Sequence, residues 1–478
     1  METKRIYKNG YLKVILSVDV KGNEFNEIVE EIKNKVDIKI LKLDLRNIMY
    51  MYSKDIAKLI FLKKICDEKK VELILANVSE SILQLLEIAD LIGLFRIEED
   101  YSSYNANELI KLFLDPEKAD FMTDYLSHHY TGEVKEDIHN AILSDDPLLR
   151  EYAILTAGKA QDYDAIKEIR NALNDEVAPV VRAAALVVGW LNDEDSKDFL
   201  YDLLESEFLD IIEAAAISIS LMATGKDATI IGRLLKSNDE NKRRIAVNAL
   251  GLINDDISYN LLMEQYERET NLFIKALIVR TLSFFRRDNL IDFFVKELEN
   301  SAIEIQEAAT SAIVRLKATD KVENLLKKLN AENSWVSFFS VKALGELGCC
   351  LDIIYKLENI YNDSQLHVKI AIVEAIGKIC NRLTDIDKSD IFNFMKNLLN
   401  EKNEDIRKEV LSVLSYLSKE DCVKVAVNLL NSDGSWIVRL KSVEVLCDLK
   451  PRGYKKILEE HLNSENNRYV IEKIQEAL

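Results

Sequence analysis

Two stretches of the chain decide its fold: DPLLREYAILTAGK at Asp146 to Lys159 and DENKRRIAVNALGLI at Asp239 to Ile253. In both, a basic residue is followed three positions later by alanine and eight positions later by glycine. Residues spaced in this way share one side of a helix, and their small size lets a second helix pack closely. We therefore expect each stretch to form one helix of a packed helix pair.

The pattern returns along most of the chain, at steps of 32, 31, 30, 32, 31, 31, 32, 38 and 32 residues. Each copy continues into a second apolar stretch, such as Leu234-Leu235 or Leu398-Leu399. A period of this length predicts stacked helix pairs with one continuous core. The aligned positions, seven of them basic, are Arg150, Arg182, Glu213, Arg243, Lys275, Gln306, Ser337, Lys369, Arg407 and Arg439.

The period also predicts the domain organisation. We expect an all-α superhelical solenoid of about ten copies over residues 144–478, ending in a C-terminal cap after Arg439. Residues 101–143 are expected to form a linker and capping helices, with a polar hinge at Glu98 to Asn107. The 38-residue step predicts an insertion around Asn381 to Ser389.

These residues resemble the short HEAT-like repeats of the phycobilisome-lyase type, whose pattern is D-x-x-V-R-x-x-A-x-x-A-L-G followed by a leucine-rich helix. Such repeats serve lyases, hydroxylases and scaffolds alike, so the resemblance implies an architecture and leaves the chemistry open. It also implies that the basic residue pairs with a carboxylate or loop carbonyl of a neighbouring copy. The residues predicted to form this structural ladder are Arg150, Arg182, Arg243, Arg407 and Arg439.

The first hundred residues follow a different period and predict a small α/β domain. Strands are expected at Leu12 to Val20, Ile38 to Leu45, Val71 to Ala76 and Phe95 to Ile97. Helices are expected from Ser53 to Lys69 and after Ser79. Their predicted apolar sides are Ile56, Leu59, Ile60, Ile65 and Cys66 in the first helix, and Ile82, Leu85, Leu86 and Ile88 in the second.

Residues 10–100 are similar to the STAS domain, the fold of bacterial anti-sigma-factor antagonists. The similarity rests on the strand end Leu43 to Leu45, on the turn before the long helix, and on a tail that pairs Asn77, Val78 and Ser79 with Ala89, Asp90, Leu91, Leu94 and Phe95. It implies a role in partner switching. Strand, helix and strand over some thirty residues independently imply a right-handed crossover and mainly parallel strands.

In the STAS family the turn usually reads D-S-S-G, and a partner kinase can phosphorylate its first serine. Here the turn reads Tyr52-Ser53-Lys54-Asp55, so Ser53 occupies the phosphoacceptor position while Tyr52 and Asp55 depart from the pattern. The resemblance implies a kinase or phosphatase as a partner. A serine at a helix start can also cap free backbone N–H groups, so both roles of Ser53 remain open.

Composition narrows the possible functions. The formal charge is −19, and residues 1–100 hold 17 basic and 18 acidic side chains, so nearly all of the excess lies beyond residue 100. An acidic solenoid repels phosphate backbones, which argues against nucleic-acid binding and favours a basic protein partner. The start METKRIYKNG has no apolar core, and no stretch approaches a membrane span, which predicts a cytoplasmic protein without membrane insertion.

The sequence shows no reaction centre. None of the five histidines is followed by glutamate, as the His-Glu steps of HEAT-repeat hydroxylases would require, so we predict no metal site. Phosphate-binding loops and the G-x-S-x-G elbow are missing, and we predict neither a cofactor nor enzymatic activity. Four aromatic residues are candidate interface anchors, with core filling as the alternative: Trp335, Phe338, Phe339 and Trp436.

The sequence thus favours a signalling or scaffold protein in which a STAS-like module, switched by phosphorylation, is coupled to a protein-binding HEAT-like surface. Two alternatives remain. One is a bilin-lyase-like enzyme that uses the concave surface as a pocket, and the other is a structural scaffold with a degenerate STAS domain.

Overall fold

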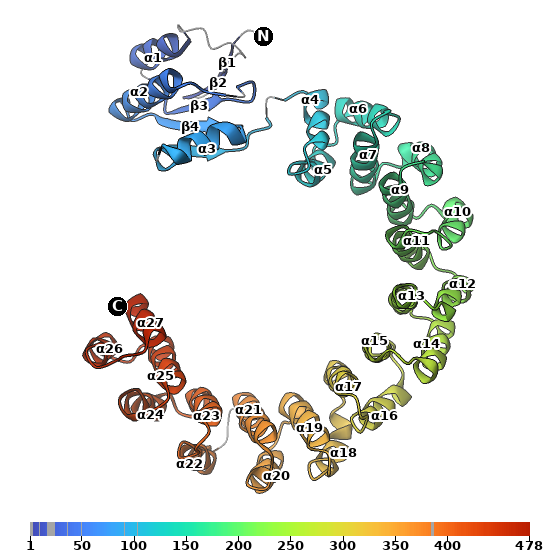
Figure 1. The fold of residues 1–478 in the computed structure, drawn as a ribbon, viewed down its shortest axis with the longest axis vertical. Helices are drawn as coiled ribbons and strands as arrows, with labels where there is room; N and C mark the ends of the chain where they lie inside the picture. The colour runs from blue at the N-terminus through green and yellow to red at the C-terminus, as the bar shows by residue number, and fades with distance from the viewer. Residues whose placement is uncertain are drawn as a thin grey trace. The chain divides into compact units, whose positions relative to one another are not determined.

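The computed structural model describes residues 3–8, 10–16, 24–35, 37–48, 50–89, 91–102, 104–383 and 387–478. Three expectations lie partly outside these residues: the end of the first predicted strand, Asp90 of the STAS-like tail, and the centre of the predicted insertion. The chain forms two compact units, Met1–Ser144 and Asp145–Leu478. Figure 1 shows a sheet with helices in the first unit and paired helices throughout the second.

The first unit contains a five-stranded sheet in the order β1-β2-β3-β4-β5. The β1 and β2 strands are antiparallel, and the remaining neighbours are parallel, as the strand-helix-strand pattern predicted. The first strand was not predicted, because its side chains are mostly exposed and lack an apolar alternation. The strands are β1 (Lys4–Lys8), β2 (Tyr11–Ile15), β3 (Ile40–Asp44), β4 (Glu72–Ala76) and β5 (Arg96–Glu98).

Alternate strand residues on one face of this sheet pack with three helices into a single core. The helices are α1 (Glu24–Asn34), which the sequence analysis missed, α2 (Ser53–Lys69) and α3 (Glu80–Ile88). Most predicted core residues are buried, but the predictions for Ile60 and Ile88 were wrong, since their exposed fractions are 38% and 85%. Both lie at the edge of an apolar stripe that the sequence made appear wider than the packed face.

Three helices and two 3-10 turns complete the first unit. A 3-10 turn at Ile92–Leu94 precedes β5, and α4 (Ala106–Ile110) runs into a second turn at Lys111–Leu114. Helix α4 begins with a capping box, in which Asn105 accepts from the Glu108 N–H and Glu108 accepts from the Asn105 N–H. The chain then turns at Asp115-Pro116 and continues as α5 (Ala119–His128) and α6 (Gly132–Ile142).

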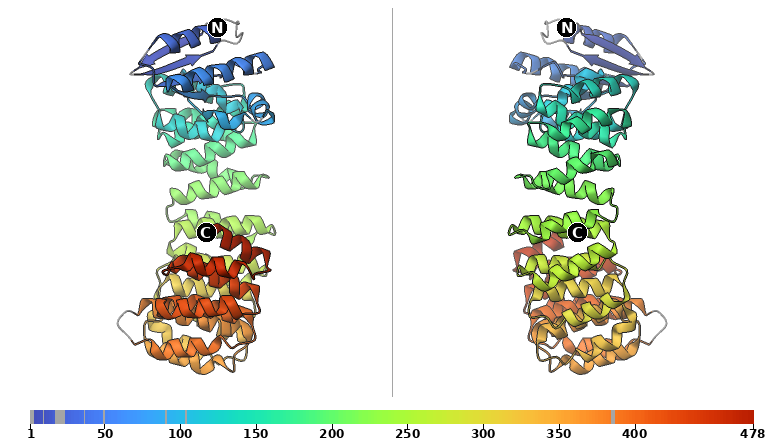
Figure 2. Two further views of the ribbon diagram at one scale, coloured as in Figure 1. Left: turned by 90° about the vertical axis from the view of Figure 1, so that its left-hand side faces the viewer. Right: turned by 90° about the vertical axis from the view of Figure 1, so that its right-hand side faces the viewer.

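The second unit is a series of helix pairs in two layers (Figure 1). The inner helices are α7 (Pro147–Lys159), α9 (Ala178–Trp190), α11 (Leu209–Leu221), α13 (Glu240–Ile253), α15 (Leu272–Leu282), α17 (Ile303–Arg315), α19 (Ser334–Leu347), α21 (Leu366–Arg382), α23 (Glu404–Leu417) and α25 (Trp436–Leu449). The outer helices are α8 (Ile166–Asn171), α10 (Lys197–Leu203), α12 (Asp227–Ile231), α14 (Asp256–Arg268), α16 (Asp288–Glu297), α18 (Val322–Lys327), α20 (Leu351–Tyr361), α22 (Ser389–Leu398), α24 (Lys419–Ser432) and α26 (Tyr454–Leu462). A last helix, α27 (Arg468–Ala477), follows without an outer partner, and Figure 2 shows the stacked helices from two sides.

Short polar residues begin many inner helices and set the register of the copies. Asp146, Asp239 and Asn333 each accept the N–H two residues further on, which satisfies a donor left free at the helix start. The acidic residue at the start of the sequence pattern is therefore an N-cap.

Glycine at the eighth position after the basic residue lets inner helices approach closely. A Cβ atom at Gly158 would lie 2.5 Å from Val187 Cγ2, and one at Gly251 would lie 2.5 Å from Thr281 Cγ2. Real Cβ atoms do not approach other atoms so closely, so a larger residue would push the helices apart.

The N-caps correct the predicted alignment in two copies. We call the fourth residue after each inner N-cap the anchor position; it is Arg150 after Asp146 and Arg243 after Asp239. After the N-caps Val177 and Phe208 it is Val181 and Ile212, so Arg182 and Glu213 stand one residue beyond it. The alignment followed charge in these copies, whereas the fold follows the helix start.

Candidate functional site

Four anchor arginines join consecutive copies. Arg439 donates from Nε and Nη2 to the two carboxylate oxygens of Glu465, at 2.8 and 2.7 Å, and from Nη1 to the Asp433 carbonyl oxygen at 3.0 Å. The carbonyl belongs to the loop before the helix of Arg439, and the carboxylate precedes the next inner helix. The same two-sided contact is made by Arg150 with Asp175, Arg243 with Glu269, and Arg407 with Asp433.

The carboxylates of these contacts are held in their charged form. Hydrogen bonds from Arg439 lower the pKa of Glu465, and the backbone N–H groups of Asn466 and Asn467 add to this against the effect of burial. At Asp433, burial favours the neutral form, but hydrogen bonds from Arg407 and the Ser435 N–H outweigh it and lower the pKa. Charge-assisted, bidentate contacts of this kind are strong and directional, so they fix how one copy stacks on the next.

Other anchor residues make a reduced contact. Gln306 donates to the Leu298 carbonyl oxygen at 2.9 Å, and Ser337 donates to that of Leu329 at 2.7 Å. Lys275 and Lys369 instead lie over the rings of Tyr266 and Tyr361. In these copies the anchor side chain bonds to a carbonyl oxygen of the preceding loop or lies over an aromatic ring. None of these four side chains makes the bidentate bond to the next copy.

Arg182, one residue beyond the anchor position, belongs to a different row on the inner helices. Its Nη2 atom lies 3.0 Å from Oε1 of Glu151 in the preceding copy. Two copies further on, Arg244 lies 3.6 Å from Glu213 in the same arrangement. Charges of opposite sign thus alternate along this row and neutralise one another.

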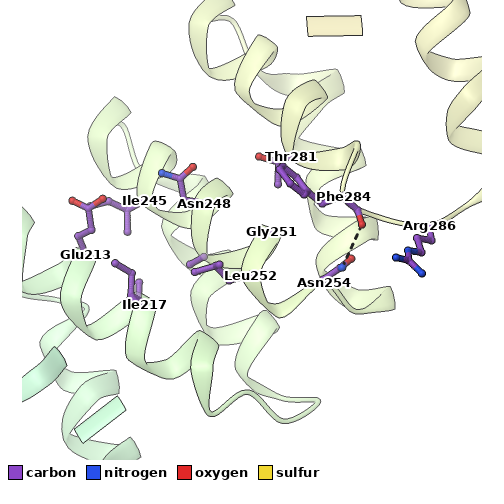
Figure 3. A pocket seen from close by; sticks show the side chains of 12 residues that line it. Glu213, Ile217, Ile245, Asn248, Gly251, Leu252, Asn254, Thr281, Phe284 and Arg286 are labelled. Atoms are coloured by element: carbon purple, nitrogen blue, oxygen red, sulfur yellow. Dashed lines mark hydrogen bonds between the residues drawn. The ribbon is translucent and has the colours of Figure 1, made fainter. Parts of the chain in front are cut away.

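Beside this row the inner helices α11, α13 and α15 enclose a cavity of about 720 Å³, which we call the inner hollow. Figure 3 shows its lining: Glu213 and Ile217 come from α11, Asn248 and Leu252 from α13, and Thr281 from α15. Phe284 and Arg286 follow α15 and close the opposite end, where Asn254 donates to the Phe284 carbonyl oxygen at 3.4 Å.

Large apolar side chains occupy one register of three successive copies, and two of them, Leu252 and Phe284, line the hollow. Leu221, Leu252 and Phe284 each stand thirteen residues after an N-cap, in three successive copies. Their exposed fractions are 53%, 56% and 53%. We call these three residues the apolar row. Large exposed apolar side chains that recur at one register of successive copies are typical of an interaction site.

The four predicted interface aromatics divide into two places. Trp335, Phe338 and Phe339 lie together on α19, with ring centroids 5.3 Å apart for Trp335 and Phe338, and His367 stacks 4.5 Å from Trp335. Phe339 is buried, while Trp335 is 37% exposed. Trp436 stacks 5.4 Å from Tyr469. The structure therefore brings the first three together, leaves Trp436 apart, and places none of the four in the inner hollow.

The Ser53 turn lies in the first unit, where Ser53 is the first residue of α2 after the N-cap Tyr52. The side chain of Ser53 lies outside the described part of the structure. Asp55 is buried, accepts the Tyr52 N–H at 3.4 Å and pairs with Lys58 at 3.4 Å. Tyr52 is 64% exposed and packs edge-on against Tyr50, and Lys54 lies 5.7 Å from the Tyr52 ring.

A buried ionic network on the sheet escaped the sequence analysis. Lys13 lies 3.1 Å from Asp100 and 3.3 Å from Asp44, while Lys42 lies 2.8 Å from Asp100. Burial disfavours the charged form of Asp100, but hydrogen bonds from Lys42, Ser102 and Lys13 overcome it and lower the pKa. The first part of the segment predicted as a hinge is thus tied to the sheet. The one signal in the sequence was that Lys13 and Lys42 each stand between apolar residues of a predicted strand.

The adjacent histidines His128 and His129 lie at a helix end. His128 and His129 contact the carbonyl oxygens of Asp124 and Tyr125 in their own helix. Within the described ranges no cluster of three or more His, Cys, Asp or Glu side chains is arranged to hold a metal ion. The same ranges contain no helix that is both long and apolar enough to span a membrane.

Comparisons with known proteins match the two units separately. The STAS domain model matches residues 9–104, and the HEAT repeat model matches residues 136–220 and 393–478. No curated protein matches the chain.

Among solved structures, the CpcE and CpcF complex of phycocyanin lyase from Nostoc sp. PCC7120 is 18% identical, with 51% of this chain and 93% of that chain covered and a TM-score of 0.30. Kap121p bound to Pho4p is 10% identical with a TM-score of 0.50, over 96% of this chain and 54% of that chain. Kap121p bound to the SUMO protease Ulp1p is also 10% identical with a TM-score of 0.50, over 96% of this chain and 53% of that chain. The chain spans about half the length of these Kap121p chains.

At this identity the Kap121p structures show a shared fold, a helical solenoid. Together with the two domain matches, they support a protein-interaction scaffold. The chain thus contains an N-terminal STAS domain, a small α/β sheet domain, followed by a solenoid of HEAT repeats.

Proposed function

We propose that this protein is a non-enzymatic signalling scaffold that holds a protein partner in the inner hollow of its repeat unit. The observation that carries the proposal is the apolar row, three large side chains more than half exposed at one register of successive copies. Fully burying an exposed side chain of this size contributes roughly 1.5–3 kcal/mol, and about half of each side chain remains to be covered, so a partner that covers all three gains about 2–4 kcal/mol. The ion pairs of Glu151 with Arg182 and of Glu213 with Arg244 add a polar rim.

The test is capture of partners from native cells by the tagged full chain. A Leu252→Asp/Phe284→Asp variant should lose a specific protein that the unaltered chain retains, since charge at these exposed positions opposes apolar docking. Tyr416→Asp is the matched control, because Tyr416 stands thirteen residues after its own N-cap and is 56% exposed. Equal capture by all three proteins, or no specific protein at all, would refute binding in the hollow and favour a structural spacer.

We further propose that the STAS domain controls this scaffold through phosphorylation of Ser53 by a partner kinase, reversed by a phosphatase. Support comes from the backbone, since Ser53 is the first residue of the 17-residue helix α2, where a helix favours negative charge. Asp55 is already bound to the Tyr52 N–H and Lys58, which reduces its repulsion of a phosphate. The exposed Tyr50 and Tyr52 give a partner an aromatic surface beside the turn.

Intact-mass analysis of the protein from its native cells tests the switch. We expect a population heavier by one phosphate, which Ser53→Ala abolishes and Ser79→Ala, at the start of α3, leaves in place. An unmodified mass under every growth condition would remove the switch and leave the scaffold.

The alternative hypothesis, an enzyme of the bilin-lyase class, can be tested separately. Mixing the full chain with free bilin should leave the visible absorbance of the pigment unchanged if the protein is a scaffold. A shifted spectrum that persists after denaturation would indicate covalent attachment and overturn the proposal.

A further inference from the structure

The inner hollow has one basic end, although the chain as a whole carries a charge of −19. The guanidinium carbon of Arg315 lies 4.3 Å from the ring centroid of Phe284, the last member of the apolar row. Arg286 lines the same end and is exposed, and it has no ion-pair partner among the residues that the structure describes. Arg280 stands one helical turn before Phe284, 3.8 Å from Glu307.

At the opposite end the charge is balanced. Glu213 lines the hollow there and lies 3.6 Å from Arg244. The two ends of the hollow therefore differ in charge. One end has the neutral ion pair of Glu213 and Arg244, Leu252 lies between the ends, and the other end has Phe284 beside Arg286, whose charge is not compensated. A ligand that lies along the apolar row meets the arginines after its last apolar side chain.

The distance between neighbouring residues of the apolar row favours a ligand with an extended backbone. Packed helices lie roughly 10 Å apart, so the apolar row offers one contact about every 10 Å. A chain in the extended polyproline II conformation advances about 3.1 Å per residue with three residues per turn, so every third side chain points the same way and falls opposite the next helix. In a helical ligand the same distance corresponds to about seven residues, which demands a far longer segment.

From this geometry we infer that the occupant of the inner hollow is an extended peptide segment with an apolar residue at every third position and acidic residues directly after the last one. This deepens the proposed function and rests on it. The apolar side chains cover Leu221, Leu252 and Phe284, and the carboxylates meet Arg286 and Arg315. Because these guanidinium groups are rim-exposed, the carboxylates mainly set the direction of the segment and its preference over basic sequences.

The direct test uses the full chain and fluorescein-labelled synthetic peptides, followed by fluorescence anisotropy. One peptide carries leucine at every third position, separated by serines, and ends in two glutamates; its control ends in two lysines. We expect the acidic peptide to bind about tenfold more tightly at low salt, with the preference falling as salt rises. A single-stranded oligonucleotide of similar length should bind weakly, because phosphates leave the apolar row uncovered.

Two variants separate the contributions. Arg286→Ala/Arg315→Ala should bind both peptides equally, while Leu252→Asp/Phe284→Asp should bind neither. Arg468→Ala, which removes an exposed arginine from α27, should behave as the unaltered chain. Unchanged circular dichroism shows that each variant is folded.

Four results would overturn the inference: equal binding of both peptides by the unaltered chain, binding of neither, a preference that survives in the arginine variant, or equally tight binding of the oligonucleotide. The proposed function fails on a different observation, namely cellular capture that does not depend on Leu252 and Phe284. Capture that depends on these two residues and not on Arg286 and Arg315 would leave the proposed function standing while removing this inference.

Discussion

The two halves of the repeat unit use one spacing of inner helices to build two different surfaces. Thirteen residues after the N-cap, the copies of α11, α13 and α15 carry Leu221, Leu252 and Phe284. In the copies of α17, α19 and α21 the same register carries Arg315, Glu346 and Lys378. Lys378 there pairs with Glu346 at 2.7 Å and with Glu374 at 2.6 Å.

The difference shows which positions the architecture leaves free. Glycine contacts hold the inner helices together in both halves, since a Cβ atom at Gly189 would meet Ser218 and one at Gly377 would meet Val413. The exposed register beside them is not required for packing, so it can be apolar in the copies of α11 to α15, charged in those of α17 to α21 and aromatic at Tyr416. Residues at this register can therefore differ between copies without disturbing the stack.

The largest expected effect on stability comes from increasing the distance between neighbouring inner helices. Gly189→Val should lower the free energy of unfolding by about 3 kcal/mol, because its Cβ atom would lie 2.7 Å from the Ser218 Cα atom, which cannot turn away. Gly377→Val should have a similar effect in the other half, and chemical denaturation measures both. Gly434→Val, at a position with no neighbouring atom within 4 Å, is the control. Sensitivity in only one half would contradict a common spacing.

Removing an anchor arginine should lower the free energy of unfolding nearly as much. Arg439→Ala removes the bidentate partner of the Glu465 carboxylate, whose side chain is 1% exposed and keeps only His461 and two backbone N–H groups, and we expect a loss of about 3 kcal/mol. Arg468→Ala breaks an exposed ion pair with Glu472 and should cost less than about 0.5 kcal/mol. Denaturation midpoints compare the two, and similar shifts would mean that the anchor contact does not hold the copies together.

The binding surfaces of the two halves should respond unequally to the same substitution. Phe284→Asp should weaken binding of the acidic peptide about thirtyfold, or roughly 2 kcal/mol. Tyr416→Asp, at the equivalent register near the C-terminus, should change it less than twofold. Anisotropy titrations of both variants measure the difference, and comparable losses would place the ligand along the whole inner face.

The smallest effect concerns pH. The pKa values of Asp175, Glu269, Asp433 and Glu465 are all lowered in the folded chain. A lowered carboxyl pKa contributes stability that is complete above the unfolded value, near 4 for Asp and Glu, and is lost as the pH falls below it. Thermal unfolding between pH 6 and pH 3 should show this decline, by about 1 kcal/mol for each anchor contact. In Arg439→Ala the decline should be shallower, and an identical slope would contradict the assignment.

Much of the fold followed from local sequence. The N-cap, the small residue and the glycine are read from positions a few residues apart, and each has a local physical cause. Arg182 was misaligned because a charged residue one position beyond the anchor resembles the pattern more closely than Val181, which occupies it.

The candidate site was harder to predict, because exposure is decided by neighbouring copies. Leu250 is fully buried and Leu252 is more than half exposed, yet both look alike in the sequence of α13. The ionic network of Lys13, Asp44 and Asp100 joins residues that are far apart in the chain, and no local pattern indicates such a contact. The predicted aromatics drew attention to α19, whereas the hollow lies on α11 to α15.

The distribution of anchor residues has a mechanical consequence. Arginines that clamp one copy to the next occupy four anchor positions, Arg150, Arg243, Arg407 and Arg439. The anchor positions between Arg150 and Arg243 are held by Val181 and Ile212, and in two copies between Arg243 and Arg407 the anchor residues Gln306 and Ser337 bond to the preceding loop. Because neighbouring copies contact mainly each other, stiffness is a local property along such an array. Under tension the copies without an arginine clamp, around Val181 and Ile212 and around Gln306 and Ser337, should separate before the clamped copies.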